Sequence, residues 1–181
     1  SQGSISRFTN VTYATGYIVS MEEQEDGQYE VVSKRRAKKL AFSARQTVET
    51  VAAAVYNRAF NATYTGGDGV VLCSAAHPTV NGNQSNLLTT AADLSETAIE
   101  DLVIQTMDAN DSRGNKIPVM PQTLNIPTAY WFEANRILNS VLQNDTANNA
   151  VNALRVTGTF PKGIKVNHYF DSTSAWFVRT N

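Results

Sequence analysis

The feature that most constrains the fold of this chain is a long run, residues 37–60, with the apolar periodicity of an α-helix. Small and apolar side chains recur there at spacings of three and four residues, and the run contains no glycine or proline. At about 1.5 Å per residue such a helix is roughly 36 Å long, two to three times the usual length. We therefore expect a long core helix, whose apolar face is formed by Ala37, Leu40, Ala41, Ala44, Val48, Val51, Ala52, Val55, Ala59 and Phe60.

The segment before this helix, residues 13–33, predicts a β-hairpin. Two β-rich arms flank Asp26 and Gly27, a dipeptide typical of two-residue hairpin turns. With that turn, Glu23 faces Glu30, and neither face of the ribbon is cleanly apolar. A lone two-stranded hairpin is marginal in water. We therefore expect this hairpin to project from its domain and to rest on another surface.

The remaining chain predicts helices and strands that segregate instead of alternating, which favours an α+β fold. A turn-rich connection occupies residues 65–86. Helices are expected over 95–109 and 128–140, with a short strand between them and strand-like alternation from Arg155 onward. The buried side of the helix over 95–109 is expected to carry Leu94, Ala98, Leu102 and Val103.

Cys73 and His77 are the residues that suggest nucleophilic chemistry, because the stretch "LCSAAHPT" holds the single cysteine and one of two histidines. A cysteine nucleophile needs a base within hydrogen-bond reach, and four extended residues separate the pair by roughly 13 Å. We favour a buried, unreactive cysteine and a loop histidine, with a cysteine-dependent hydrolase as an alternative. One cysteine and two histidines also fall short of a structural zinc site. We therefore expect no catalytic, cofactor-binding or metal-binding residues.

Charged residues gather at both ends of the predicted hairpin, and they suggest a contact between copies of the chain. The basic run "KRRAKK", residues 34–39, could contact nucleic acid or be solvated. We favour a third interpretation, in which an acidic hairpin tip meets the basic base of a neighbouring copy, a head-to-tail contact that closes into rings. The residues of this hypothesis are Glu22, Glu23, Glu25, Asp26, Lys34, Arg35 and Arg36.

Composition narrows the function classes. The net charge is −1, which argues against a protein whose main affinity is for phosphate backbones. The sequence has no apolar run of some 18 residues, so it predicts no membrane span. A single cysteine cannot form an internal disulfide, which fits a reducing compartment.

An ordered set of motifs between residues 67 and 95 resembles the tailed-phage major capsid protein, in the group of the Mu-like prophage major head subunit. In that group a "GDG-x-x-L-(F/C)-S-x-x-H-P" segment, a "G-x-x-S-N" segment and a "D-L-S" helix start recur in this order. The resemblance covers most of the chain from about residue 37 onward. The matching positions are Gly67 to Gly69, Leu72 to Ser74, His77, Pro78, Gly82, Ser85, Asn86 and Asp93 to Ser95.

The resemblance implies an α+β tailed-phage major capsid fold, with a projecting E-loop hairpin, a long spine helix, a P domain and an A domain, truncated at both ends. Residues 1–12 are then the remnant of an N-terminal arm, and residues 13–35 the E-loop-like hairpin. Residues 36–120 form the spine helix and a P-domain-like region, and residues 121–181 an A-domain-like region.

The function implied is that of a structural subunit without catalytic residues. It forms pentamers and hexamers that close into an icosahedral shell around phage double-stranded DNA, with non-specific DNA contact. The other partners implied are a scaffold, a maturation protease and a portal, with assembly in the host bacterial cytoplasm and no membrane. A nanocompartment shell of the same fold is the nearest alternative, and the hydrolase using Cys73 and His77 is the second.

Overall fold

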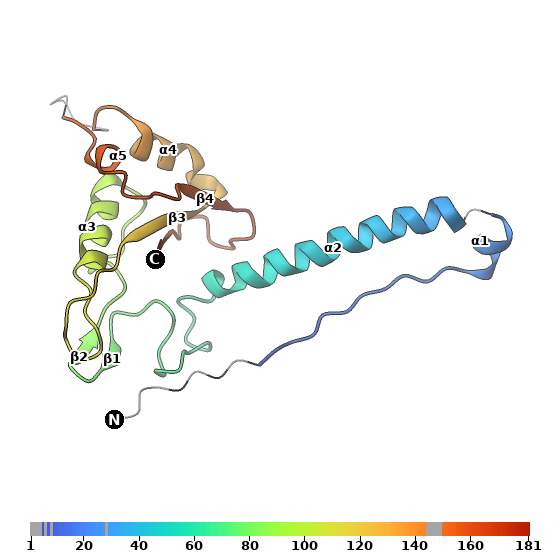
Figure 1. Ribbon diagram of the computed structural model, residues 1–181, viewed down its shortest axis with the longest axis horizontal. Helices are drawn as coiled ribbons and strands as arrows, with labels where there is room; N and C mark the ends of the chain where they lie inside the picture. The colour runs from blue at the N-terminus through green and yellow to red at the C-terminus, as the bar shows by residue number, and fades with distance from the viewer. Residues whose placement is uncertain (1–4, 6, 8, 28, 144–149) are drawn as a thin grey trace. The chain divides into compact units, whose positions relative to one another are not determined.

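The computed structural model describes residues 5, 7, 9–27, 29–143 and 150–181, which include both helices and strands (Figure 1). The α+β class predicted from the sequence is confirmed. Two compact units are present, Arg7–Val55 and a second that contains Tyr56–Asn181. The division into arm, E-loop, P and A regions came from the family resemblance and not from contacts within the chain. It stays a prediction.

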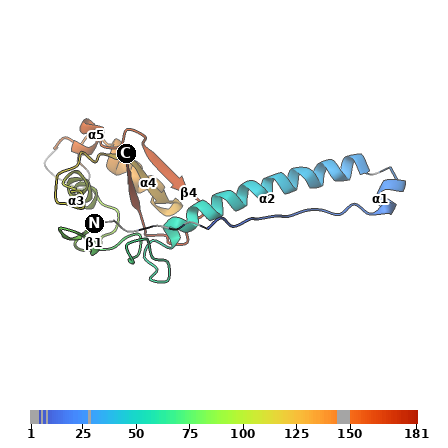
Figure 2. The same ribbon diagram turned by 60° about the horizontal axis from the view of Figure 1, so that its bottom comes forward.

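The first unit contains an extended segment followed by two helices, α1 (Met21–Glu25) and α2 (Tyr29–Asn57), whose last two residues belong to the second unit. Residues 9–19 form an extended trace that leads into α1, after which the chain turns back into α2 (Figures 1 and 2). The β-hairpin predicted for residues 13–35 is therefore wrong, because the end of its first arm (residues 21–25) and the second arm from residue 29 onward are helical. Gly27, with φ of 68°, lies in the turn between two helices and not between two strands.

The reason for this difference is a capping box at the start of α1. The backbone N–H of Glu23 donates to Ser20 Oγ at 3.2 Å, and the Glu23 carboxylate accepts from the Ser20 backbone N–H at 3.4 Å. Together these bonds satisfy two backbone donors that a helix start leaves unpaired. The Ser-x-x-Glu spacing that predicts a capped helix start was present in the sequence. It determines the local structure here, whereas the hairpin turn suggested by Asp26 and Gly27 does not form.

The long helix predicted over 37–60 is confirmed as α2, although it begins at Tyr29 and ends at Asn57. Its predicted role as a core helix is wrong for much of its length. Val48 is 67% exposed and Val55 is 57% exposed, and both belong to the expected apolar face. The periodicity correctly located an apolar stripe, but this stripe remains largely uncovered.

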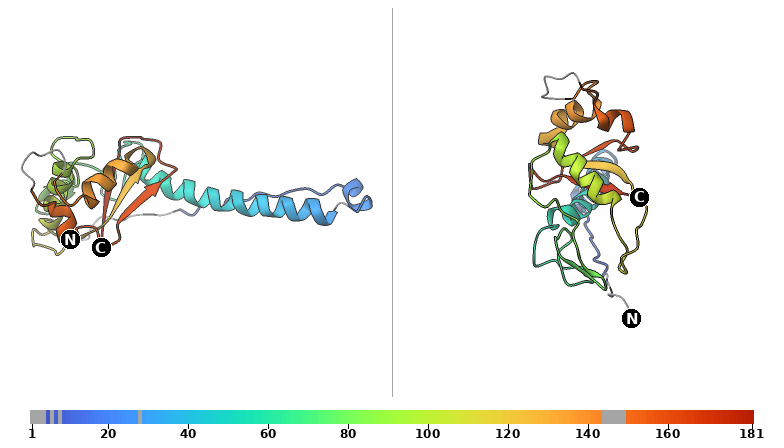
Figure 3. Two further views of the ribbon diagram at one scale, coloured as in Figure 1. Left: turned by 90° about the horizontal axis from the view of Figure 1, so that it is seen from above. Right: turned by 90° about the vertical axis from the view of Figure 1, so that its left-hand side faces the viewer.

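The second unit is organised around a three-stranded sheet in the order β4-β3-β5. The central strand β3 (Pro121–Pro127) pairs in parallel with β4 (Ile164–Asn167) and antiparallel with β5 (Phe177–Thr180). A separate two-stranded hairpin is formed by β1 (His77–Thr79) and β2 (Gly82–Gln84). Three helices gather around the sheet: α3 (Glu96–Met107), α4 (Trp131–Asn139) and α5 (Ala153–Thr157) (Figure 3).

The hydrophobic core lies on one face of β3, where Leu124 and Ile126 are fully buried against the helices. Because side chains alternate between faces of a strand, Asn125 points to the opposite face. The core residues contributed by the helices and the segment before α3 are Leu94, Ile99, Val103, Ala134, Ile137 and Leu154.

Most sequence predictions for this unit are confirmed. The helix expected over 95–109 is α3, capped by Ser95 Oγ, which accepts from the Ala98 N–H at 3.2 Å. The helix expected over 128–140 is the 3₁₀ turn η1 (Thr128–Tyr130) followed by α4. Of the expected buried residues, Leu94, Ala98 and Val103 are buried, whereas Leu102 is only half-buried.

The strand alternation expected from Arg155 is wrong at its start, because Arg155 lies within α5. Asn152 caps this helix with its side-chain oxygen, which accepts from the Arg155 N–H at 3.1 Å. Gly158 adopts the left-handed conformation, with φ of 59°, that ends a helix readily. Local capping at both ends therefore imposes one helical turn ahead of the strands β4 and β5.

Candidate assembly surfaces

The charged residues that the sequence analysis assigned to a contact between copies include an ion pair within one chain. Arg36 donates to both carboxylate oxygens of Glu23, at 2.7 and 2.5 Å, and to the backbone carbonyl of Ile18 at 2.8 Å. The hydrogen bond from Arg36 lowers the pKa of Glu23 below its usual value. Two of the seven predicted contact residues therefore bind each other, and they fix the start of α1 against α2.

The other five predicted contact residues are exposed in the same unit. Lys34 lies 3.7 Å from Glu30 one helical turn earlier, an exposed pair of the kind that contributes little to stability. The acidic members flank the turn between α1 and α2, and the basic members lie in the first part of α2. They are Glu22, Glu25 and Asp26 on the acidic side, and Lys34 and Arg35 on the basic side.

Cys73 and His77 do not form a nucleophile and base pair. His77 Nδ1 lies 2.6 Å from Asp68 Oδ2, and this hydrogen bond lowers the pKa of Asp68. His77 Nε2 is buried and has no hydrogen-bond partner among the residues that the structure describes. Among the described residues no hydrogen bond joins the Cys73 thiol to His77. Burial raises the pKa of the Cys73 thiol, which disfavours the thiolate that a cysteine-dependent hydrolase uses.

The motif residues instead hold one another in place. Asn86 accepts from the Ser74 backbone N–H at 2.8 Å and donates to the Leu72 carbonyl at 2.7 Å. Together with the Asp68–His77 pair, these bonds connect the "GDG", "LCS", "HP" and "SN" segments of the sequence. The stretch "LCSAAHPT" is thus part of a hydrogen-bonded structure, but the expected buried cysteine and loop histidine differ from it: Cys73 is only half-buried, and His77 is the first residue of strand β1.

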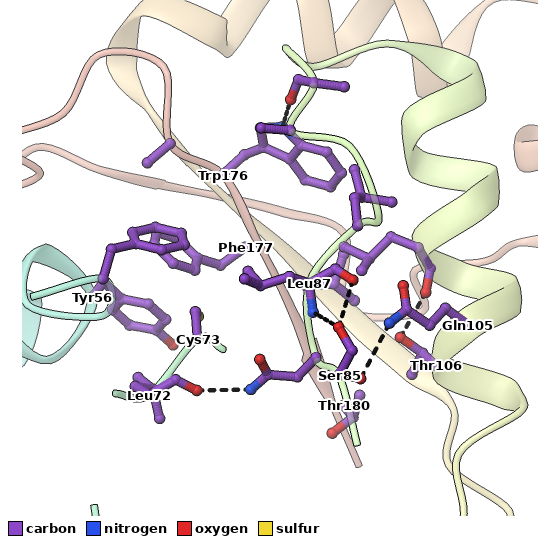
Figure 4. Close-up of a pocket in the computed structure, with 18 of the residues that line it drawn as sticks. Tyr56, Leu72, Cys73, Ser85, Leu87, Gln105, Thr106, Trp176, Phe177 and Thr180 are labelled. Atoms are coloured by element: carbon purple, nitrogen blue, oxygen red, sulfur yellow. Dashed lines mark hydrogen bonds between the residues drawn. The ribbon is translucent and has the colours of Figure 1, made fainter. Parts of the chain in front are cut away.

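A groove of about 1410 Å³ opens within the second unit, at the outer edge of β5 (Figure 4). Its lining includes Phe177 and Val178, two successive residues that point to opposite faces of the sheet. No residue of β3 or β4 lines it. Because both faces of β5 contribute and the neighbouring strands do not, the groove lies beside the strand and not above the sheet.

One wall of the groove is an aromatic cluster centred on Phe177. Its ring lies 5.0 Å from Tyr56, 5.7 Å from Phe170 and 6.0 Å from Phe60, measured between centroids. Asn125 on the central strand donates to Tyr56 Oη at 3.2 Å, which connects this ring to the sheet within the second unit. Aromatic packing of this kind stabilises beyond the area it buries. This wall is therefore well supported, with Leu72 on its exposed side at 48% exposure.

Sequence reasoning missed this groove. Its walls come from segments far apart in the chain: the end of α2 and Phe60, residues 72–73, residues 84–93, α3 with the residues after it, and residues 170–180 with β5. The sequence pointed to this groove only in the final strand-like run "AWFVRT", where apolar residues lie on both faces of the expected strand.

Two general features bear on function. Among the described residues, no group of three or more His, Cys, Asp or Glu side chains is placed to hold a metal ion. None of the helices in that part of the chain has the length and apolar character needed to cross a membrane.

Comparison with known proteins supplies the family. The family model described as phage capsid protein matches residues 6–181. The chain belongs to the phage capsid protein family. No curated protein and no solved structure matches it.

Membership of this family makes the chain a structural protein of a bacteriophage capsid, and it places the protein in the virion. The resemblance inferred from the motifs between residues 67 and 95 is therefore confirmed at the level of a phage capsid protein. Self-association into a shell is what such a family implies. The bonded loop and the edge groove are accordingly best understood as parts of a shell subunit.

Proposed function

We propose that this chain is a major head subunit of a tailed phage, in the group of the Mu-like prophages. Copies form pentamers and hexamers that close into an icosahedral shell around double-stranded DNA, which they contact non-specifically. Assembly takes place in the host cytoplasm with a scaffold, a maturation protease and a portal. In this assignment α2 is the spine helix, residues 13–35 occupy the E-loop position, and P-like and A-like regions follow.

The observation that carries this proposal, beside the family match, is the uncovered apolar face of α2. Val48, Val51 and Val55 lie on one side of the helix and are 42–67% exposed. Contiguous exposed apolar surface on a soluble protein marks a site of association. A shell subunit surrounded by neighbours can cover such a face, whereas an isolated monomer leaves it in water.

The test is light scattering combined with negative-stain electron microscopy on the full-length gene product, expressed alone. Megadalton shells or rings of five and six copies support the proposal. The contents separate the two shell functions, because a phage head encloses DNA and a nanocompartment encloses a cellular protein. A stable monomer at all concentrations, also with the scaffold co-expressed, contradicts both.

The charge contact proposed between neighbours now rests on the exposed residues alone. Lys34 and Arg35 of one copy meet Glu22, Glu25 and Asp26 of the next. Arg36 and Glu23 are excluded because they bind each other within one chain. Replacing Lys34 and Arg35 by Glu should then reduce self-association, most strongly at low salt. Adding Glu22→Lys and Glu25→Lys to this variant should restore it. Unchanged assembly of the first variant contradicts the contact.

A further inference from the structure

The uncovered face of α2 carries a regular seam of six small or apolar residues. Alternating spacings of four and three positions separate them, and all six residues are exposed. This alternation is the heptad repeat that keeps one side of a helix against a second helix in a coiled coil. The seam therefore fits a partner helix better than a strand. Its residues are Ala37, Ala41, Ala44, Val48, Val51 and Val55.

Contacts within the first unit leave this seam free. Arg36 donates to the Ile18 carbonyl at 2.8 Å, and the less exposed residues in the first half of α2 include Ser33, Arg36 and Leu40. These three lie on a neighbouring side of the helix, between the positions of the seam. Most of the stability of a helix in a protein comes from packing of its apolar face. The seam of α2 has no such packing within the first unit.

The seam is complementary to an antiparallel copy of itself. Its N-terminal half consists of three alanines and its C-terminal half of three valines. If Ala44 lies opposite Val48 of an antiparallel partner, then residue 41 lies opposite 51 and residue 37 opposite 55. Every layer then joins one alanine to one valine, so all layers have the same width. A parallel pair joins alanine to alanine and valine to valine, which leaves layers of unequal width that fill less evenly.

The charges along α2 favour the same orientation. The basic run lies at residues 34–39, whereas residues 46–57 contain Glu49 as their single charged residue. An antiparallel pair places the basic run of each helix against the nearly uncharged half of the other, and a parallel pair places basic run against basic run, which is repulsive. Near the centre of the antiparallel pair Arg45 meets its own counterpart, with Glu49 of the other copy less than one helical turn away.

We propose that α2 of one copy pairs antiparallel with α2 of a second copy along this seam, around a two-fold axis between Ala44 and Val48. The seam runs from residue 37 to residue 55, about 27 Å of helix. The contact uses the same surface on both copies, so it is distinct from the head-to-tail charge contact at the turn between α1 and α2. This inference rests on the proposed function, because it names what covers the exposed face of a shell subunit.

The occupant is a second copy because the described part of one chain has no free helix that matches the seam. The helices α3 and α4 have 12 and 9 residues, fewer than the seam spans. Their apolar side chains, such as Ile99 and Ile137, are already buried in the core of the second unit. The helices α1 and α5 have five residues each. The helix that matches α2 in length and in exposed apolar face is therefore another α2.

Cross-linking of single-cysteine chains tests the orientation. Ala37→Cys and Val55→Cys are each made in the whole chain with Cys73→Ala, so that each variant has one thiol. The two are expressed separately and also together with different tags, and a short bis-maleimide is added. The antiparallel pair predicts a cross-link between the two variants and none of either variant with itself, because equal positions are about 27 Å apart. Cross-linking of each variant with itself indicates a parallel pair and overturns the inference.

A charge placed in the seam tests whether this face mediates association. Val48→Asp puts a carboxylate in a central layer, and Gln46→Asp puts the same charge on the opposite side of α2. Both residues are exposed, so both variants should keep the fold, which thermal unfolding checks. In sedimentation velocity Val48→Asp should weaken self-association of the whole chain at least about tenfold, because a charge in an apolar layer is costly. Gln46→Asp should not weaken it, and equal association of the two variants overturns the pairing.

The outcomes separate this inference from the proposed function. If the full-length protein forms shells in which residues 37 and 55 do not cross-link, the helix pairing is overturned and the shell function stands. If these residues cross-link and no shells form, also with the scaffold co-expressed, the pairing stands and the shell function fails. If Val48→Asp weakens association but the cross-link is absent, a segment other than α2 covers the seam, which overturns the inference.

Discussion

Arg36 and Glu23 form a two-pronged ion pair that spans the turn between α1 and α2, with N–O distances of 2.7 and 2.5 Å. The same arginine holds the Ile18 carbonyl, and the same glutamate completes the capping box with Ser20. One pair of side chains therefore fixes three things: the start of α1, its angle to α2 and the end of the extended segment. A paired Arg–carboxylate geometry of this type is more specific than a point charge.

Replacing Glu23 by Gln should loosen this turn. The pKa of Glu23 is lowered by its hydrogen bond with Arg36, so its contribution is complete above the ordinary pKa of a glutamate and is lost as pH falls through the lowered value. Amide hydrogen exchange over residues 18–25 should therefore be faster in Glu23→Gln at neutral pH, and the unaltered chain should approach that rate in acid after correction for intrinsic exchange. Glu22→Gln, an exposed neighbour, is the control, and equal exchange in both variants contradicts the assignment.

Ile99 and Ile104 provide a matched test of where the core lies. Both are isoleucines on α3, but Ile99 is fully buried and Ile104 is 56% exposed. Ile99→Ala should lower the free energy of unfolding by about 2–5 kcal/mol, because it removes buried methyl groups and leaves a cavity. Ile104→Ala should change it by less than about 1 kcal/mol. Denaturant unfolding monitored by circular dichroism measures both, and similar losses would place the core elsewhere.

This pair also shows what the sequence could and could not predict. The apolar periodicity located α3 and α4 within a few residues, because both helices bury one face against Leu124 and Ile126. The periodicity missed Ile99 because several neighbouring positions of α3 are apolar. Only the packing of the helix decides which of these side chains lies in the centre of the core. For α2 the same periodicity found the stripe correctly but could not reveal that Val48 and Val55 stay exposed, because coverage depends on other elements or other copies.

The candidate surfaces were less predictable from the sequence than the helices were. The charged residues around the turn were found because charge is visible in a sequence, but the bond between Glu23 and Arg36 was not, because it depends on a helix where a strand was expected. The groove could not be predicted, because its walls come from segments that are far apart in the sequence. The motif resemblance predicted a phage capsid protein, which the family model confirms, and the bonds of Asp68 and Asn86 give those motifs a structural reason.

Asn152 should be essential for the stability of the second unit. It is fully buried, and its amide donates to the Ile137 carbonyl at 2.5 Å and to Ser140 Oγ at 2.9 Å, while its oxygen caps α5. Asn152→Leu keeps the size but leaves these groups unpaired, which should lower stability by about 1–3 kcal/mol. Asn139→Ala, at an exposed position of α4, should have little effect. Thermal unfolding of the two variants compares them, and an unchanged melting temperature in Asn152→Leu contradicts the role.

The Cys73 thiol should react slowly in the folded chain. Burial raises its pKa, so at neutral pH even less thiolate is present than in an exposed cysteine, and the thiolate is the reactive form. Labelling with a thiol reagent should therefore be much slower in the native chain than in denaturant, and it should accelerate as pH rises. Cys73→Ala should assemble like the unaltered protein. Rapid labelling at neutral pH would instead indicate an activated thiol and would favour the hydrolase alternative, in which Asp68 holds Nδ1 of His77 and Nε2 is the base.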